Sequence, residues 1–280
     1  MATIIFPQLT IMFCEDPCEF KYNIVTDEDV DDFEPSELFI NIAQNMGYSE
    51  IDTKKFNVAI AKDHKGIKCA IAIKPYNQAI APYLKIKHPN VLELIKYEKI
   101  TITDSLFLKT YKERYRSLDT WFVVTKYVDG ENFEDAIVEN INLTPNEMLN
   151  IATQLFDGVN AIHATGYLHL DLLWMANIIV TPENHLVIID VEGGNIKDFN
   201  NPQIKDPIIK DRKEAAALLI NAIRYKMETR RNFDNKYYQL RDKEESTLIY
   251  SDKYPIIAKE FLSYYPSYHE TTKLIISAFN

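Results

Sequence analysis

Near residue 130 the hydrophobic pattern of the chain changes from that of strands to that of helices. Before this point, Phe56–Ala61 (FNVAIA) and Lys68–Lys74 (KCAIAIK) flank the turn-rich segment Asp63–Gly66, which predicts an antiparallel hairpin. Further strands are predicted near Lys99–Leu108 and at Trp121–Tyr127 (WFVVTKY). A strand-rich half followed by a helical half predicts an α+β chain with a small antiparallel β lobe and a mainly helical lobe.

The first long helix of the second half has a well-marked start. Thr144 is the expected N-cap, Pro145 occupies the first helical position, and Glu147 completes a capping box. Apolar residues then recur every three or four positions, which predicts one buried face. The later elements expected from the pattern are strands at Asn177–Thr181 and Leu186–Ile189 and a helix at Asp211–Tyr225.

These patterns divide the chain into three parts. Residues 1–50 are interpreted as an N-terminal extension that contains a short helix at Ser36–Met46, stopped by Gly47. Residues 51–128 are predicted to form the small β-rich lobe, and residues 129–280 the helical lobe.

Composition excludes several function classes. Only 7 of the 280 residues are glycine, and no two of them are separated by a single residue. A dinucleotide-binding turn, a P-loop and an intact kinase glycine-rich loop are therefore excluded. The net charge of −10 disfavours nucleic-acid binding. No apolar run reaches the roughly 18 residues that a membrane span needs, and three sparse cysteines suit a reducing compartment. A cytoplasmic location is therefore expected. The residue usage is rich in Tyr, Ile, Asn and Lys, which is typical of some viral and pathogen proteins. For such a protein, the expected location would be the cytoplasm of the host cell.

The segment Ile162–Gly194 contains the residues that point to chemistry. Its HLDL tetrapeptide, with His169 and Asp171, stands where the protein-kinase superfamily has H-R-D-L. Asn177 is near the position of the family's metal-binding asparagine, and Asp190 begins a D-V-E sequence where the family has D-F-G. The segment therefore resembles the catalytic core of a protein kinase.

This resemblance implies a two-lobed protein-kinase-like fold and a set of roles. Asp171 would orient the attacking hydroxyl and accept its proton, while Asn177 and Asp190 would hold Mg²⁺ on the phosphates of ATP. His169 in this position would brace the catalytic loop. The implied cofactors are thus ATP and Mg²⁺.

The small lobe contains a looser match. Lys74 ends the strand CAIAIK, as the family's nucleotide-binding lysine ends V-A-I-K. Val58 and Ala61 lie upstream at about the family's intervals, and Thr125 takes the position of the gatekeeper residue. Residues 84–91 (LKIKHPNV) resemble the family's L-x-x-x-H-P-N-I stretch. The residues whose backbone would face adenine are Lys126, Tyr127 and Val128.

The chain also departs from the family pattern in its small lobe. The glycine-rich loop would lie near Ile51–Asn57, which contains no glycine. The glutamate of helix αC would fall near Gln78 or Ala79, neither of which is acidic, and Pro82 would break a helix there. The partner of Lys74 would then have to come from the extension, with the candidates Glu34, Glu37 and Glu50.

The catalytic segment departs from the pattern as well. Asp171 and Asn177 are six positions apart, against five in the family. Leu173 stands where Ser/Thr kinases have a lysine, and no A-P-E follows. Only 20 residues separate Asp190 from Asp211, so the activation segment is expected to be reduced.

Three functions remain open on these residues. The first is an atypical Ser/Thr protein kinase that transfers the γ-phosphate of ATP to a protein hydroxyl. The second is a catalytically inactive pseudokinase that acts as a module binding a partner protein, which the missing glycines favour. The third is a small-molecule phosphotransferase of the aminoglycoside- or choline-kinase type, which the D-V-E-G sequence favours and the H-P-N sequence disfavours.

Overall fold

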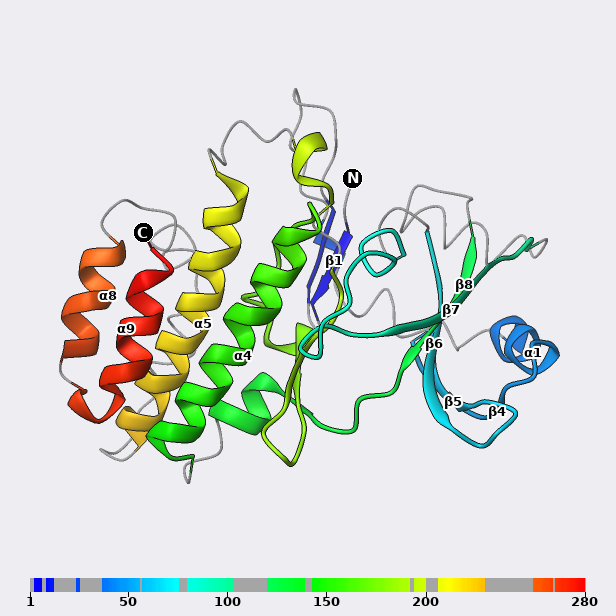
Figure 1. The fold of residues 1–280 in the computed structure, drawn as a ribbon. Helices are drawn as coiled ribbons and strands as arrows, with labels where there is room; N and C mark the ends of the chain where they lie inside the picture. The colour runs from blue at the N-terminus through cyan, green and yellow to red at the C-terminus, as the bar shows by residue number, and fades with distance from the viewer. Residues whose placement is uncertain are drawn as a thin grey trace. The chain divides into compact units, whose positions relative to one another are not determined.

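The computed structural model describes residues 3–6, 9–12, 24–25, 37–55, 57–75, 80–102, 120–138, 143–191, 194–199, 206–229, 254–263 and 265–279 (Figure 1). The chain divides into two compact units. One comprises Met1–Ile80 and Leu94–Tyr127, and the other comprises Ala81–Glu93 and Val128–Asn280. Residues 81–93, which sequence analysis assigned to the small lobe, cluster with the helical unit.

The first unit is built on a five-stranded antiparallel sheet in the order β4-β5-β6-β8-β7. Its strands are β4 (Ser49–Lys55), β5 (Val58–Lys62), β6 (Lys68–Lys74), β7 (Leu94–Lys99) and β8 (Trp121–Lys126). The hairpin predicted around residues 63–66 is confirmed. The Asp63 side chain accepts hydrogen bonds from the backbone of Lys65 and Ile67, which fixes the turn between β5 and β6.

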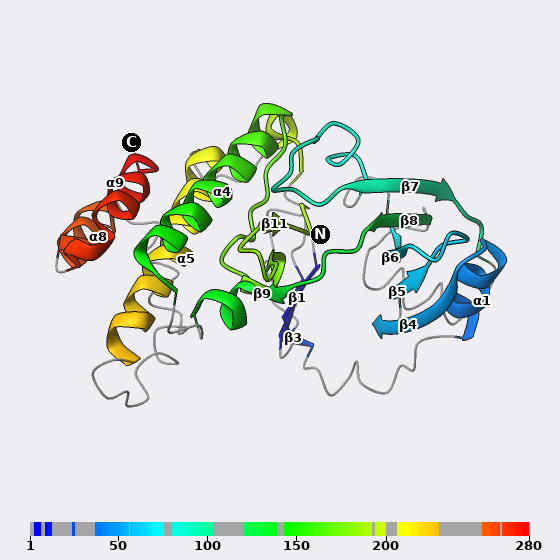
Figure 2. The same cartoon turned by 60° about the horizontal axis from the view of Figure 1, so that its bottom comes forward.

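One face of this sheet is covered by helix α1 (Glu37–Asn45), which lies beside β4 in Figures 1 and 2. Phe39 and Ala43 of α1 belong to a core cluster with Cys69 and Ile71 of β6. Because side chains alternate along a strand, Lys74 lies on the other face of β6. The short helix predicted in the extension is therefore confirmed, and it buries the sheet face opposite Lys74.

Two elements of this unit differ from the sequence prediction. The strand expected at Lys99–Leu108 lies earlier, at Leu94–Lys99, and residues 103–119 are outside the described part of the chain. Its residues after Leu94 are exposed, so the alternation that predicts strands is weak in it. The segment expected to replace the glycine-rich loop is mostly strand, because β4 pairs with β5 as far as Lys55 opposite Val58.

A second, three-stranded antiparallel sheet precedes α1 in the chain. Its order is β1-β2-β3, with β1 at Thr3–Phe6, β2 at Leu9–Met12 and β3 at Ile24–Val25.

The helical unit is organised around α4 (Pro145–Ala164), which packs against α5 (Pro207–Thr229) and α9 (His269–Ser277) (Figures 1 and 2). Helix α8 (Tyr254–Ser263) packs against α9. The predicted capping box of α4 is confirmed: Glu147 N donates to Thr144 Oγ1 at 3.3 Å, and Thr144 N donates to the Glu147 carboxylate at 2.8 Å.

Helix α5 begins four residues before the predicted start at Asp211. The Asp206 carboxylate accepts hydrogen bonds from Ile208 N at 3.0 Å and Ile209 N at 3.1 Å, and Pro207 occupies the first helical position. This Asp-Pro start moves Asp211 from the end of the helix into its second turn.

A small antiparallel sheet belongs to the helical unit, with its strands in the order β11-β10-β9. Strands β10 (Ile178–Val180) and β11 (Leu186–Ile188) confirm the two predicted strands, and β9 is Glu131–Asn132. The short helices of this unit are η2 (Glu134–Val138), η3 (Met175–Asn177), η4 (Ile196–Asp198) and η5 (Pro266–Tyr268).

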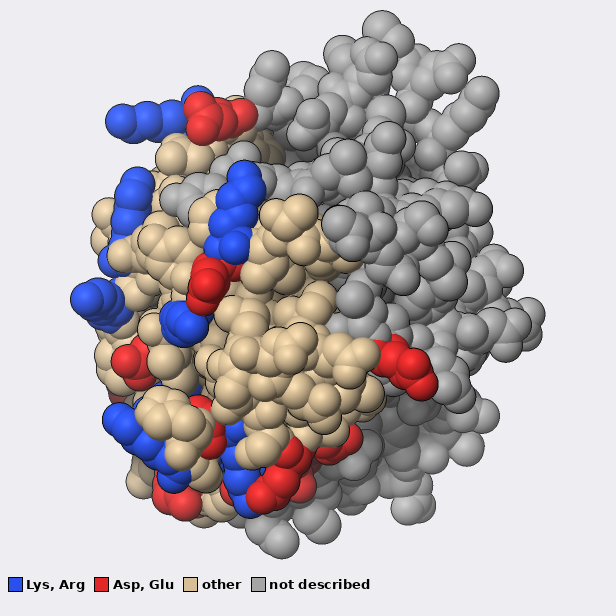
Figure 3. Space-filling model, turned by 90° about the vertical axis from the view of Figure 1, so that its right-hand side faces the viewer, with Lys and Arg blue, Asp and Glu red and all other residues tan. Residues whose placement is uncertain are grey.

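Charged side chains of both signs are interspersed on the described part of the face drawn in Figure 3. Exposed ion pairs occur on the five-stranded sheet, such as Lys54 with Asp52 and Lys96 with Glu98. Exposed pairs of this kind contribute little to stability. Among the helices that the structure describes, none combines the length and hydrophobicity needed to cross a bilayer.

Candidate active site

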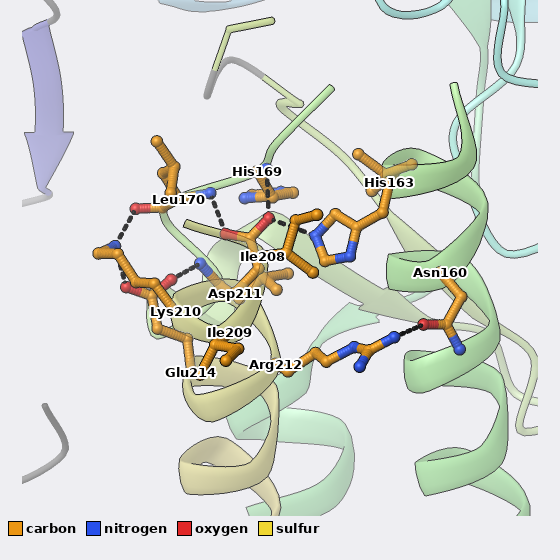
Figure 4. Close-up of polar contacts among 12 residues, drawn as sticks. Asn160, His163, His169, Leu170, Ile208, Ile209, Lys210, Asp211, Arg212 and Glu214 are labelled. Carbon is orange, nitrogen blue, oxygen red and sulfur yellow. Dashed lines mark hydrogen bonds and ion pairs between the residues drawn. The ribbon is translucent and has the colours of Figure 1, made fainter. Parts of the chain in front are cut away.

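The loop that contains Asp171 is held from below by the carboxylate of Asp211 on α5 (Figure 4). Asp211 accepts hydrogen bonds from His169 N at 2.7 Å and Leu170 N at 2.6 Å. His163 of α4 contributes its Nε2 to the same carboxylate at 2.9 Å. Asp211 is fully buried, and its three partners supply the hydrogen bonds that a buried carboxylate requires. Leu170 has a φ of 61°, and the bond from its amide to Asp211 offsets the cost of this left-handed conformation.

His169 connects this loop to the segment before Asp190. Its side chain is 1% exposed, and its Nε2 donates to the carbonyl of Ile189 at 2.8 Å. A carbonyl can only accept, so Nε2 carries the proton in this bond. His169 thus links the loop that contains Asp171 to the segment before Asp190, and its role as a brace of the loop stays a prediction.

Asp171 and Asn177 are brought together despite their six-residue spacing. Asn177 Nδ2 donates to Asp171 Oδ2 at 2.9 Å and to the Asp171 carbonyl at 3.0 Å. The chain between them folds tightly, since Trp174 N donates to the Asp171 carbonyl and η3 ends on Asn177. The extra residue is absorbed in this turn, and the buried Asn177 side chain still reaches Asp171.

Asp190 follows a residue whose backbone is hydrogen-bonded to that of Asn177. Ile189 N donates to the Asn177 carbonyl at 2.8 Å, which brings the residue before Asp190 against Asn177. Asp190 has a φ of 53°, in the left-handed region. The next amide, that of the fully buried Val191, donates to the hydroxyl of Tyr83 at 2.9 Å and so fixes the backbone on the other side of Asp190.

The surroundings of Asp171 favour its neutral form. Burial raises the pKa of the Asp171 carboxyl to about 7, and the negative charges of Glu214 and Asp190 act in the same direction. The hydrogen bond from Asn177 and the positive charge of Lys210 act in the opposite direction. A base whose pKa is near neutrality is suited to accept a proton at physiological pH.

The donor set suits Mg²⁺ only in part. Among the described residues, no group of three or more His, Cys, Asp or Glu side chains could hold a metal ion. Asp190 offers a carboxylate, and Asn177 offers Oδ1, since both of its hydrogen bonds described above use Nδ2. Mg²⁺ is commonly bound by one or two protein oxygens together with phosphate oxygens and water. These residues therefore fit Mg²⁺ in a complex with a phosphate ligand.

Lys74, in the other unit, lies at the end of β6 and shares its sheet face with Ala72. Val58 is paired directly opposite Ala72, so it lies on this face too. Thr125 of β8 is paired opposite Ala70 and lies on the same face.

Ala61, which was expected to contribute to nucleotide binding together with Val58, does not lie on the sheet face of Lys74. Ala61 is paired opposite Cys69 and is buried in the core cluster under α1, on the face away from Lys74. Because alternation along β5 gives Val58 and Ala61 opposite faces, only Val58 shares the face of Lys74. Ala72, two positions before Lys74, is the small residue of this face, and the alternation of β6 could have identified it.

The residues expected to face adenine lie where β8 ends. Lys126 is the exposed last residue of β8, and the ring of Tyr127 lies 3.8 Å below the Nζ of Lys68. Val128 is the first residue assigned to the helical unit in this part of the chain.

The acidic residues of the extension that were considered as ion-pair partners of Lys74 have other positions where the structure describes them. Glu50 pairs with Lys62, and Glu37 belongs to α1, which covers the face opposite Lys74. Glu34, Gln78 and Ala79 lie outside the described residues, as do Glu192 and Gly193 of the D-V-E-G sequence.

Sequence analysis missed the side chains that support the loop. Lys210 Nζ donates to the Leu170 carbonyl at 3.1 Å and pairs with Glu214, and Leu172 N donates to Glu214 at 3.1 Å (Figure 4). Together with Asp211, these residues come from the first turns of α5. The sequence signal was a cluster of charges in the otherwise apolar stretch of that helix.

Comparison with known proteins agrees with this arrangement. The model of the family described as "Protein kinase domain" matches residues 53–203. A tyrosine-protein kinase of Spongilla lacustris, SRK3, is 26% identical over 194 residues, which are 66% of this chain and 53% of that protein. A provisionally named cyclin-dependent kinase F-2 of Oryza sativa subsp. japonica is 30% identical over 107 residues, 37% of this chain and 32% of that protein. The matches thus span about half or less of each relative.

The family model matches more than half of this chain, and the structure has an antiparallel sheet unit and a helical unit. The chain therefore belongs to the protein kinase family.

Proposed function

We propose that this protein is an ATP- and Mg²⁺-dependent kinase that phosphorylates Ser or Thr hydroxyls of proteins. The observation that carries the proposal is the cluster of Asp171, Asn177 and Asp190. Asn177 Nδ2 donates hydrogen bonds to Asp171, and the Asn177 carbonyl accepts one from the backbone of Ile189, the residue before Asp190. Family membership supports phosphoryl transfer in general. The names of the two relatives refer to different kinds of kinase, so the choice of Ser and Thr rests on the sequence resemblance.

In the proposed reaction, Asp171 orients the substrate hydroxyl and accepts its proton. A pKa of about 7 keeps a substantial share of Asp171 ionised at neutral pH and still basic enough to accept a proton. Asn177 Nδ2 fixes the orientation of the carboxylate, while Asp211 and His169 hold the loop.

The remaining roles concern the phosphates. Lys74 would contact them from the end of β6, and Asp190 together with Asn177 Oδ1 would hold the metal ion. When bound, Mg²⁺ neutralises the negative charge that develops on the transferred phosphoryl group. The residues on the sheet face of Lys74 would line the site of the adenine ring of ATP. They are Val58, Ala72 and Thr125.

A second candidate is a pseudokinase that binds a partner protein without catalysis. One observation favours it: the segment expected to cover the phosphates is the glycine-free strand β4, paired with β5 up to Lys55. Side chains at every position hinder the close backbone approach to phosphate that glycine permits. This feature is expected to weaken ATP binding.

One experiment on the full-length protein distinguishes the two candidate functions. ATP binding is measured by thermal shift with and without MgCl₂, and transfer from γ-labelled ATP is then measured to the protein itself, to casein, to choline and to an aminoglycoside. Mg²⁺-dependent label on Ser or Thr of a protein is the expected result. Binding of ATP without transfer would favour the pseudokinase, and label on the small molecules alone would favour a small-molecule phosphotransferase.

A further inference from the structure

Helix α5 contacts both peptide groups that bound Asp171, and Figure 4 shows the contact between Lys210 and Leu170. The carbonyl of Leu170, in the peptide group before Asp171, accepts a hydrogen bond from Lys210 Nζ at 3.1 Å. The N–H of Leu172, in the peptide group after it, donates to Glu214 Oε2 at 3.1 Å. The two α5 side chains are therefore hydrogen-bonded to the backbone immediately before and after Asp171.

These two side chains also form an ion pair with each other. Lys210 and Glu214 are one helical turn apart and in direct contact, and their side chains are 14% and 3% exposed. A buried ion pair contributes little net stability, because the cost of removing two charges from water offsets their attraction. Stability alone is thus a weak reason for this pair, whereas its contacts with the loop give it a specific geometric role.

Lys210, one member of the pair, also brings an ammonium group to a loop whose own sequence contains no Lys or Arg. Leu173 stands where the resemblance to Ser/Thr kinases leads one to expect a lysine. Lys210 brings an ammonium group to the same loop from another element of the fold, and it does so through the Leu170 carbonyl.

We propose that Lys210 and Glu214 are positioning residues, which hold the two peptide groups around Asp171 so that its carboxylate faces the substrate hydroxyl. This inference rests on the proposed function, since it concerns the geometry of the proposed base. Asp211 fixes the amides of His169 and Leu170, and the Lys210–Glu214 pair extends this support across Asp171 to Leu172.

The test combines kinetics with hydrogen–deuterium exchange on the full-length protein. Lys210→Met keeps the aliphatic stem and removes the ammonium group. We expect kcat to fall roughly 10–100-fold, the range that a small misplacement of a catalytic group can cost, with little change in the KM for ATP. Exchange in the peptide covering residues 169–174 is expected to accelerate in the same variant. Lys210→Arg, which keeps the charge and the donors, is expected to restore most of the lost turnover.

Lys213→Met is the matched control, because it makes the same change in the next turn of α5 and is expected to alter neither quantity. If Lys210→Met does not fold, Glu214→Gln is tested in its place. This near-isosteric change breaks the ion pair and is expected to lower kcat and accelerate exchange by smaller factors. Faster exchange with unchanged kcat would overturn the proposal, as would reduced kcat with unchanged exchange or no change in either. If the wild-type protein transfers no phosphate, the proposed function fails, and the exchange rate alone then decides whether the pair holds the loop.

Discussion

The side-chain amide of Asn177 donates hydrogen bonds to the carboxylate of Asp171 at 2.9 Å and to its backbone carbonyl at 3.0 Å. This contact forms even though one more residue separates the two positions than in the family pattern. It fixes the orientation of the proposed base and uses only the nitrogen of the amide. The oxygen of Asn177 is the atom that a metal ion would take.

The rate of phosphoryl transfer is expected to rise with pH and to be half-maximal near pH 7. The raised pKa of Asp171, about 7, means that the carboxyl becomes an ionised base only as the pH passes this value. The measurement is kcat at saturating ATP and MgCl₂ between pH 5.5 and 8.5, a range of about three units around that pKa. A rate that is independent of pH across this range would exclude Asp171 as the group that must be ionised.

The same pKa predicts how stability changes with pH. The folded state keeps a proton on Asp171 between its ordinary pKa of 3.8 and about 7, whereas the unfolded state loses it. The contribution of this group to the free energy of unfolding therefore falls as the pH rises through that window, by at most about 4 kcal/mol. Urea unfolding of wild type and Asp171→Asn is compared at pH 5 and pH 8. The variant is expected to be the more stable one at pH 8, and an equal difference at both pH values would contradict the assignment.

Tyr83→Phe is expected to loosen the backbone at Asp190. The substitution keeps the ring and removes the hydroxyl that accepts the hydrogen bond from the buried Val191 amide. An unsatisfied buried donor costs about 1–3 kcal/mol, so the free energy of unfolding should fall by this amount. The apparent affinity for Mg²⁺ in the presence of ATP should fall as well. Tyr97→Phe, at an exposed position, is the control and should change stability by less than about 0.5 kcal/mol.

Asp211→Ala is expected to be strongly destabilising. It leaves the amides of His169 and Leu170 without their acceptor, at about 1–3 kcal/mol each. Unfolding in urea should show a loss of about 2–6 kcal/mol, against less than about 0.5 kcal/mol for the exposed Asp157→Asn on α4. A loss as small as that of the control would mean that Asp211 does not support the loop.

Much of the architecture was predictable because its signals are local. The capping box at Thr144, the turn at Asp63 and the alternation in β6 each depend on residues a few positions apart. The order of the motifs along the chain likewise predicts the family from the sequence alone.

The features that were missed depend on distant residues or on weak patterns. The contacts of Lys210 and Glu214 with the loop that contains Asp171 join residues about 40 positions apart, and no periodicity predicts them. β7 was misplaced because, after Leu94, both of its faces are exposed, so burial imposes no alternation on its sequence. Ala61 was assigned by its interval from Lys74, whereas strand register decides which face it occupies.

The most direct test of the account is phosphoryl transfer by Asp171→Asn compared with wild type. Asparagine keeps an oxygen that can accept the hydrogen bond from Asn177 but cannot accept the substrate proton. We predict that transfer from ATP to a protein hydroxyl falls by about 10²–10⁴-fold in this variant, while ATP and Mg²⁺ bind as in wild type. Transfer at the wild-type rate in this variant would contradict the assignment of Asp171 as the catalytic base.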